Sequence, residues 1–378
     1  MERVYEAEEK CCGCGLCMAV CPNKAIEMKA DTKGFYYPHI DKNKCINCGI
    51  CKKTCLKIGK AYTERKHTYA IKNKSLAERK SSSSGGFFIE LAKYVINNDG
   101  IVYGVAFDKL FKVKHILAED KATLENIKGS KYVQSSAFER FSEIKENLDK
   151  GKIVLFSGTP CQISGLGKYL KNEYNNLLTC ENICHGVGSP KIFEEYIKDK
   201  KYDVLAEKIS FRYKNTNGDH NLSIDLKNGK KIIKLPYNDE YYKMFTDDLC
   251  IRPSCFECQF ANLERRADFT IGDFWGVENV IPNFKDNNGV SIVILNSEKS
   301  KVIFEKIKNN FILKEVELKN SLQPNLEQPT IKPNNYDEYW SDYIARGYRY
   351  IAKKYGRLSR IDSLKRKTRR ILRKIKYG

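Results

Sequence analysis

Two cysteine runs of identical spacing occupy the first 55 residues of the chain. Both read C-x2-C-x2-C-x3-C, from Cys11 to Cys21 and from Cys45 to Cys55. In this spacing the first three thiolates of each run bind one [4Fe–4S] cluster, and the fourth thiolate binds the other cluster. The sequence therefore predicts two clusters. Cluster I is expected on Cys11, Cys14, Cys17 and Cys55, and cluster II on Cys45, Cys48, Cys51 and Cys21.

Two other uses of these cysteines fit the sequence less well. Disulfides need an oxidising compartment, and no secretory signal precedes Cys11. Zinc sites favour paired CxxC units that are separated by a longer loop. Two features depart from the repeated pattern: Leu56 follows the second run where Pro22 follows the first, and Cys12 is interpreted as a bystander.

The composition is typical of a globular protein. Of the 378 residues, 42% are hydrophobic and 30% are charged. No apolar stretch approaches the roughly 20 residues that span a membrane. The chain has 15 cysteines and no secretory signal, which favours a reducing cytoplasm in which thiolates bind metals. We therefore expect a cytoplasmic location.

The apolar pattern divides the chain into three parts. Residues 1–60 form a small α+β ferredoxin-like domain with two clusters, and residues 61–80 form a polar connector. Residues 81–335 alternate strands and helices, which predicts an α/β body with a mixed sheet and flanking helices. Residues 336–378 form a helical tail. Strands are expected at 101–107, 114–119, 153–156, 177–183, 208–213, 222–226, 231–235 and 291–295, and helices at 87–96, 136–149, 190–200, 298–309 and in the stretch that ends near 170.

The tail is strongly basic. Ten Lys and Arg residues lie between Arg357 and Gly378, against Asp362 as the one acid, and they carry close to half of the net charge of +20. Apolar side chains fall on one helical face of the same stretch, at Ile361, Leu364, Thr368, Ile371, Leu372 and Ile375. This pattern predicts a basic amphipathic helix that docks on an anionic membrane surface at the inner face of the cell membrane. Packing on the body is an equal alternative, and nucleic-acid binding is the least favoured.

The body contains a second set of cysteines, and part of it resembles a metal site. Cys255 and Cys258 form a CxxC unit, and Cys161 and Cys184 each follow an expected strand. Parallel strands gather ligands at their carboxyl ends. These four thiolates are therefore predicted to bind a third [4Fe–4S] cluster, with Cys180 as the reserve ligand. The alternative is that they are buried structural cysteines, which behave as small apolar residues.

Three loops carry polar groups suited to a cofactor. Ser84, Gly85 and Gly86 precede a helix, whose free N–H groups and dipole favour a phosphate, although an ordinary capped helix start explains them too. The loop 129–135 contains Lys131 and suits a flavin ring or a phosphate, unless it is an exposed polar loop. The loop 268–276 contains Asp273 and an aromatic–glycine sequence that can pack along a flat ring, although its Trp could equally lie in the core.

The order of the motifs resembles a known family. They are Ser84-Gly85-Gly86, Gly129-Ser130-Lys131-Tyr132, Gly158-Thr159-Pro160-Cys161-Gln162, Cys184-His185-Gly186, Pro253-Ser254-Cys255-x-x-Cys258 and Gly272-Asp273-Phe274-Trp275-Gly276. This order is similar to the coenzyme F420 hydrogenase/dehydrogenase beta-subunit family over about residues 1–320. The resemblance implies an FAD-binding α/β body with iron–sulfur clusters. It also implies a cofactor role for Ser84, Gly85 and Gly86 at the phosphates, and for Thr159, Lys131 and Asp273 at the ring.

The hypothesis is an iron–sulfur flavoprotein oxidoreductase. Electrons would pass from the ferredoxin-type clusters through FAD to an unidentified small-molecule acceptor, because a flavin accepts electrons singly and delivers a hydride. Ferredoxin or another redox protein is the expected partner. Bacterial relatives with this N-terminal module suggest a role in surface polysaccharide biosynthesis. Two alternatives stay open: a coenzyme F420-linked dehydrogenase or hydrogenase beta subunit, and a pure electron-transfer subunit of a larger complex.

Overall fold

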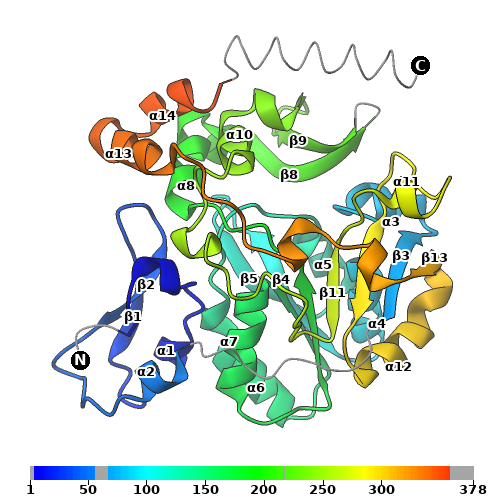
Figure 1. Cartoon of the computed structure of the whole chain (residues 1–378), viewed down its shortest axis with the longest axis horizontal. Helices are drawn as coiled ribbons and strands as arrows, with labels where there is room; N and C mark the ends of the chain where they lie inside the picture. Colours follow the sequence, from blue (N-terminus) through cyan, green and yellow to red (C-terminus); the bar gives the residue numbers. More distant parts are fainter. Residues whose placement is uncertain (1–3, 56–66, 216–217, 358–378) are drawn as a thin grey trace.

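An eight-stranded mixed sheet forms the centre of the body in the computed structural model, which describes residues 4–55, 67–215 and 218–357 (Figure 1). In spatial order the strands are β13 (Phe311–Val316), β3 (His67–Asn73), β12 (Ser291–Leu295), β11 (Phe269–Asp273), β7 (Leu177–Asn182), β6 (Val154–Gly158), β4 (Ile101–Phe107) and β5 (Val113–Ala118). The four neighbours β11, β7, β6 and β4 are parallel, and the other strands pair antiparallel at the two sides. The expected mixed α/β body is confirmed.

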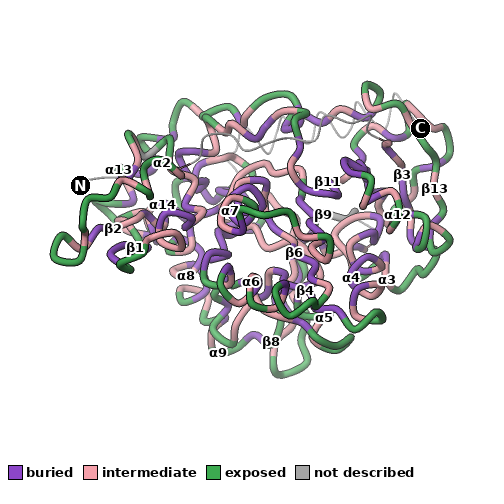
Figure 2. The backbone as a smooth tube through the Cα atoms, turned by 90° about the horizontal axis from the view of Figure 1, so that it is seen from below, coloured by how far each residue is buried: buried purple, intermediate pink, exposed green. Residues whose placement is uncertain are grey.

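Helices cover both faces of this sheet because its central strands are apolar on both faces. Val102 and Leu155 lie opposite each other in register and share a core with helix α4 (Phe87–Asn97). Their neighbours Tyr103 and Phe156 belong to the core on the other face. That face is covered by α6 (Phe141–Asp149) and α7 (Pro160–Leu170), while α12 (Glu298–Ile307) lies on the α4 side. Buried segments gather along the sheet and beneath these helices (Figure 2).

The N-terminal module lies beside α7. It contains α1 (Leu16–Ala19), the antiparallel strands β1 (Ile26–Ala30) and β2 (Tyr36–Ile40), and α2 (Ile50–Thr54). Its apolar residues share one core with the body, and this core includes Cys17, Ile26, Ile40, Phe138, Phe141 and Leu166. The module is therefore packed on the body rather than tethered to it (Figure 1).

A second, three-stranded antiparallel sheet completes the body. Its strands are β8 (Ala206–Asn215), β9 (Gly218–Leu226) and β10 (Lys231–Lys234), with the expected Asn228-Gly229 turn between the last two. It shares a core with α8 (Pro190–Asp199), α10 (Glu240–Thr246), α13 (Tyr336–Arg346) and α14 (Tyr348–Lys354). The remaining short helices are α3 (Leu76–Ser81), α5 (Lys121–Ile127), α9 (Tyr202–Leu205) and α11 (Val277–Val280).

Two boundaries expected from the sequence are wrong. Residues 67–80 are not a connector: β3 lies between β12 and β13 inside the large sheet, so the body begins before residue 81. Residues 336–354 are not part of a tail, because α13 and α14 bury Trp340, Tyr343 and Ile351 against the second sheet. The predicted amphipathic helix at 359–376 lies outside the described residues. Within the described part of the chain, no helix is both long enough and apolar enough to cross a membrane.

One buried histidine predicts a pH dependence of stability. His115 in β5 is 1% exposed, its ring stacks on Phe156, and its Nε2 lies 3.0 Å from the carbonyl oxygen of Ser157, to which it donates. Burial lowers its pKa to about 4 from an ordinary 6.5. The unfolded chain therefore binds more protons between these two values, so stability falls as the pH drops through that window.

When the pH is lowered from 7 to 5, this histidine is expected to lower the free energy of unfolding by about 2 kcal/mol. His115→Gln keeps a hydrogen-bond donor and removes the titration, so its urea midpoint should fall less than that of the wild type over the same pH range. The matched control is His39→Gln, since His39 is exposed. Equal pH slopes for the wild type and His115→Gln would contradict the assignment.

Candidate functional site

The eight N-terminal cysteines form two groups that cross between the runs. The thiol of Cys17 lies within electrostatic reach of Cys14, Cys11 and Cys55, and burial followed by these neighbours raises its pKa. The thiol of Cys51 has Cys21 and Cys48 as its neighbours. A small cavity is lined by Cys21, Cys45, Cys48 and Cys51 together. The structure thus brings together the two sets of four that the sequence predicts.

Each cysteine run turns at a glycine with a left-handed backbone. Gly15 and Gly49 cap α1 and α2 with φ of 71° and 74°. This conformation favours glycine. At Gly15 a Cβ would also lie 2.2 Å from Phe138, so the first run presses closely against the body. The following helix starts direct backbone N–H groups toward the thiols, as from Leu16 to Cys14 and from Lys52 to Cys51. Hydrogen bonds of this kind stabilise thiolate ligands.

A third group of four thiols lies in the body. Cys184 follows β7 and has Cys255, Cys161 and Cys258 as its neighbours. Burial, with these thiols close by, raises the pKa of Cys255 to about 12 and that of Cys258 to about 11. The structure therefore assembles the four residues predicted for a third cluster, from the start of α7, the end of β7 and the CxxC loop.

The other body cysteines stand apart from this group. Cys180 lies in β7 within the apolar core, beside Glu181 and Asp268, so it is not the reserve ligand that the sequence suggested. Cys250 is fully buried in the core of the second sheet. Within the described residues, no three His, Cys, Asp or Glu side chains surround a single ion. A [4Fe–4S] cluster takes its four thiolates on separate irons, so this does not count against the cysteine groups.

Cys12 is not a bystander. Its thiol neighbours those of Cys14 in the cluster I group and Cys161 in the third group, and both raise its pKa. Cys12 is in turn the largest influence on Cys161 and lowers the pKa of that thiol to about 7. Thr159 also contacts Cys161, since its Oγ1 lies 3.1 Å from the Cys161 sulfur. The two cysteine groups are therefore joined by side-chain contact, which the spacing of the runs gave no reason to expect.

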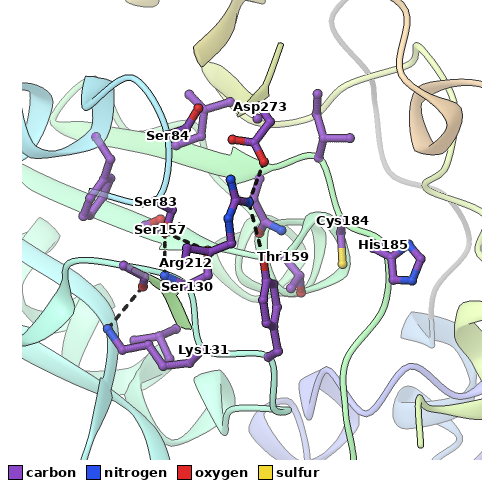
Figure 3. A pocket seen from close by; sticks show the side chains of 18 of the residues that line it. Ser83, Ser84, Ser130, Lys131, Ser157, Thr159, Cys184, His185, Arg212 and Asp273 are labelled. Atoms are coloured by element: carbon purple, nitrogen blue, oxygen red, sulfur yellow. Dashed lines mark hydrogen bonds and ion pairs between the residues drawn. The ribbon is translucent and has the colours of Figure 1, made fainter. Parts of the chain in front are cut away.

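A cavity of about 340 Å³ opens at the carboxyl ends of the parallel strands (Figure 3). Its wall includes Ser157–Thr159 at the end of β6, Asn182–Val187 at the end of β7 and in the loop that follows, and Ile271–Asp273 in β11. Ligands of open α/β sheets bind at this edge. Among the predicted cofactor residues, Ser84, Gly86, Lys131, Thr159 and Asp273 line the cavity. Cys184 lines it as well, so the third cysteine group forms part of its wall.

Gly85 is a packing residue rather than a phosphate contact. Its N–H donates to the hydroxyl of Ser291 at 2.8 Å, and a Cβ there would lie 2.2 Å from the carbonyl oxygen of Ile71. Ser84 donates its hydroxyl to the carbonyl of Val290 at 2.9 Å. These bonds fix the loop to β12 and the residue before it, and the Gly85 carbonyl accepts the N–H of Asn73 in β3 at 2.8 Å. The predicted phosphate role of Gly85 is therefore wrong.

The helix start itself stays open toward the cavity. Gly86 is the N-cap of α4 with φ of 85° and supplies no side-chain cap, and Gly86, Phe87 and Phe88 all line the cavity. An α-helix leaves its first N–H groups without intrahelical partners, and they favour an anion. Ser83 stands beside this helix start and lines the cavity as well. Its hydroxyl lies 2.9 Å from that of Ser130 and accepts the Ser130 N–H at 2.7 Å.

An ion pair closes the cavity on the side of the second sheet. Nη1 of Arg212 lies 2.5 Å from Oδ2 of Asp273 and 3.4 Å from the hydroxyl of Tyr132 (Figure 3). Burial alone would lower the pKa of Arg212, but Tyr132 and Asp273 raise it. Arg212 has a left-handed φ of 65°, where the β8–β9 register shifts. This bulge, which no sequence pattern indicated, turns the guanidinium toward Asp273.

Lys131 and Thr159, which were predicted to contact the flavin ring, form hydrogen bonds with other parts of the protein. The ammonium of Lys131 donates to the carbonyls of Asn126, Lys128 and Gly129 at 3.1, 2.7 and 3.3 Å, so it holds its own loop together. Burial lowers its pKa to about 7. Thr159 begins α7 in a capping box with Gln162. Trp275 is not a core residue: it is 56% exposed at the edge of the cavity.

Two family matches cover most of the described chain. Residues 10–57 match the 4Fe-4S dicluster domain, and residues 151–321 match the C-terminal region of the coenzyme F420 hydrogenase/dehydrogenase beta subunit. No curated protein matches the chain. One solved structure that matches is a chain of the xenon-derivatised F420-reducing [NiFe] hydrogenase complex from Methanosarcina barkeri. It is 17% identical, with a TM-score of 0.46, and the match covers 78% of this chain and 89% of that chain.

The first match agrees with the paired cysteine groups, and the expectation of [4Fe–4S] clusters in the N-terminal module is confirmed. The second covers β6 to β13, which include Cys161, Cys184, Cys255, Cys258 and Asp273. The protein thus carries a 4Fe-4S dicluster domain at residues 10–57 and, at residues 151–321, a region that matches the C-terminal part of the coenzyme F420 hydrogenase/dehydrogenase beta subunit.

Proposed function

We propose that this protein is an iron–sulfur flavoprotein oxidoreductase with an electron-transfer role like that of an F420 hydrogenase beta subunit. It would hold clusters I and II, a third cluster on Cys161, Cys184, Cys255 and Cys258, and FAD in the cavity. It would exchange electrons between a redox partner protein and a two-electron carrier. The family matches give no support to polysaccharide biosynthesis, so that role is not part of the proposal.

The main support for this proposal is that the cluster I group, the third cysteine group and the cavity lie next to one another. The thiol of Cys12 contacts both Cys14 and Cys161, and Cys184 forms part of the cavity wall. The cluster I group, the third group and the cavity therefore follow one another through side-chain contacts. A chain of adjacent sites is what electron transfer between proteins and a small carrier requires, whereas a scaffold with structural clusters would not need it.

The cavity fits a flavin in size and chemistry. Its volume of about 340 Å³ lies within the range of about 300–1,000 Å³ that is usual for cofactor pockets. The start of α4, with Ser83 and Gly86, would hold the phosphates, and Thr159 and the Arg212–Asp273 pair would face the rest of the molecule. A bound flavin accepts single electrons and donates a hydride, which suits a site between clusters and a two-electron carrier.

Exposed Trp275 favours a planar carrier over a pure electron-transfer subunit. Its indole is 56% exposed and lies at the cavity edge. Aromatic faces in such positions stack on flat rings. A deazaflavin such as coenzyme F420 has such a ring, so the F420-linked alternative is the form of the proposal that we favour.

Anaerobic purification with iron, sulfide and flavin quantified together tests the proposal. About twelve irons per chain, the content of three cubane clusters, are expected with one FAD. Reduced protein should then transfer a hydride to oxidised F420, followed as the loss of F420 absorbance. About eight irons without flavin would contradict the proposal.

A further inference from the structure

Arg252 is a fully buried guanidinium between two cysteine groups. It precedes the 3-10 turn Pro253–Cys255, and its side chain is 0% exposed. Its Nε donates to the carbonyl of Cys11 at 2.8 Å, and its Nη2 donates to that of Tyr36 at 3.0 Å. Arg252 thus lies between the loop that carries cluster I and the loop that carries Cys255.

The cysteine loop lies directly against this guanidinium. Gly13 has φ of 68°, and a Cβ on it would lie 3.0 Å from Nη1 of Arg252 and 2.8 Å from Nε2 of Gln134. Only a glycine lets the backbone between Cys11 and Cys14 approach so closely. The close contact with Arg252 therefore depends on a glycine of the first cysteine run.

No carboxylate of the described residues pairs with Arg252. Its three hydrogen bonds to oxygen go to neutral acceptors, the third being Oε1 of Gln134 at 3.2 Å, and its charge lies 4.2 Å from the ring centre of Tyr37. A buried charge without a partner is strongly unfavourable. Of the four groups that raise the pKa of Arg252, three are thiols, those of Cys11, Cys12 and Cys255, and the fourth is the phenol of Tyr37. The countercharge that this site provides for is therefore mainly on sulfur.

Buried arginines elsewhere in the body have carboxylate partners. Arg265 is 2% exposed and its Nε lies 2.5 Å from Oε1 of Glu181, and Arg212 pairs with Asp273. Arg252 therefore differs from them in its partner and not in its burial. A [4Fe–4S] cluster with four thiolates is an anion that gains one more negative charge on reduction.

We propose that Arg252 is a shared counter-ion of cluster I and the third cluster, which raises the reduction potential of both and leaves cluster II unaffected. For the third cluster the inference rests on the function proposed above. A fixed positive charge in a low-dielectric site favours the more negative, reduced state of each cluster. One electron enters, the cluster charge changes by one, and no proton moves. The neighbours of Cys51 are thiols of its own group, and Arg252 is not among them.

The test is a potentiometric titration of the full-length holoprotein, followed by electron paramagnetic resonance. Arg252→Gln should lower the potentials of two of the three clusters. The expected shift is a tenfold or larger change in the ratio of reduced to oxidised cluster, which is about 59 mV for one electron. Arg252→Lys keeps the charge and should shift them less. Movement of no cluster, or equal movement of all three, would overturn the proposal.

Lys10→Gln is the matched control. It removes the same charge next to Cys11, but the Lys10 side chain is 60% exposed and pairs with Glu257, so solvent and salt screen it. Its potentials should equal those of the wild type. A shift as large as that of Arg252→Gln would mean that net charge, and not the buried site, sets the potentials.

Iron content separates the remaining outcomes. If Arg252→Gln loses iron while Arg252→Lys retains it, the positive charge itself is required, which supports the proposal. If both lose iron equally, Arg252 is a hydrogen-bonding brace and the proposal fails. If the wild type holds only about eight irons, the proposed third cluster fails. In that case a selective shift of one of the two remaining clusters supports a counter-ion at cluster I, and its absence overturns it.

Discussion

Replacing Cys255 and Cys258 together with alanine is expected to remove about four of about twelve irons per chain, because two of the four thiolates of the third group are lost. The two N-terminal clusters should stay, since their eight cysteines are untouched and their groups do not include the CxxC loop. Iron and sulfide analysis after anaerobic purification measures the loss, and the paramagnetic signals of the N-terminal clusters should be unchanged.

Cys180→Ala is the matched control for this prediction. Cys180 is fully buried but lies in the apolar core away from the third group. Its replacement should lower stability slightly through the small cavity that it leaves, while the iron content stays at the wild-type level. A double alanine variant that keeps its full iron content would show that these thiols are structural, which was the alternative from the sequence.

Replacing Ser83 with aspartate is expected to weaken FAD binding on the order of a thousandfold. The carboxylate would stand at the open start of α4, where the phosphates are proposed to lie. Two like charges about 4 Å apart repel by about 4 kcal/mol at the effective dielectric of a protein surface. The same carboxylate favours the helix dipole, so the stability of the flavin-free protein should not fall. Flavin released by denaturation, together with the melting temperature, measures both effects.

Ser83→Asn is the control because it has nearly the same size as aspartate and can accept the Ser130 N–H, but it carries no charge. It should keep its flavin. Full flavin content in Ser83→Asp would move the phosphates to another part of the cavity. Gly85 is unsuitable for such a test, because a larger residue there would collide with the backbone of Ile71 whether or not a ligand binds.

The sequence predicted the parts of the site that depend on short-range spacing. Both cysteine runs carry their own turn geometry, so the cluster groups could be assigned before any fold was known. The strands at 101–107 and 291–295 were placed at their observed bounds because they are continuous apolar runs. The four thiols of the third group were found from a CxxC unit and from strand ends, which are also local signals.

Contacts between distant segments were beyond the sequence. Arg212 lies at a bulge in the second sheet and reaches the cavity from there. Arg252 forms a hydrogen bond with Cys11, which lies 241 positions away in the sequence. The polar, Lys-rich composition of residues 61–80 predicts a connector, whereas the burial of β3 comes from pairing with β12 and β13. Cys12 contacts Cys161 because the fold places α7 beside the first cysteine run, and no local sequence pattern indicates this contact. In each case the deciding energy is tertiary packing, which overrides local propensity.

The position of β3 also sets an order of assembly during synthesis. β3 is made early, yet both of its neighbours come more than 200 residues later, β12 at 291–295 and β13 at 311–316. The cysteine runs, in contrast, are complete by residue 55. Since chains fold from the N-terminus as they leave the ribosome, the dicluster domain can bind iron before β12 and β13, which pair with β3, have been made. The cavity wall at Ser84, which bonds to the residue before β12, forms only after that residue has been made, so the flavin that we propose there would bind later than the clusters of the dicluster domain.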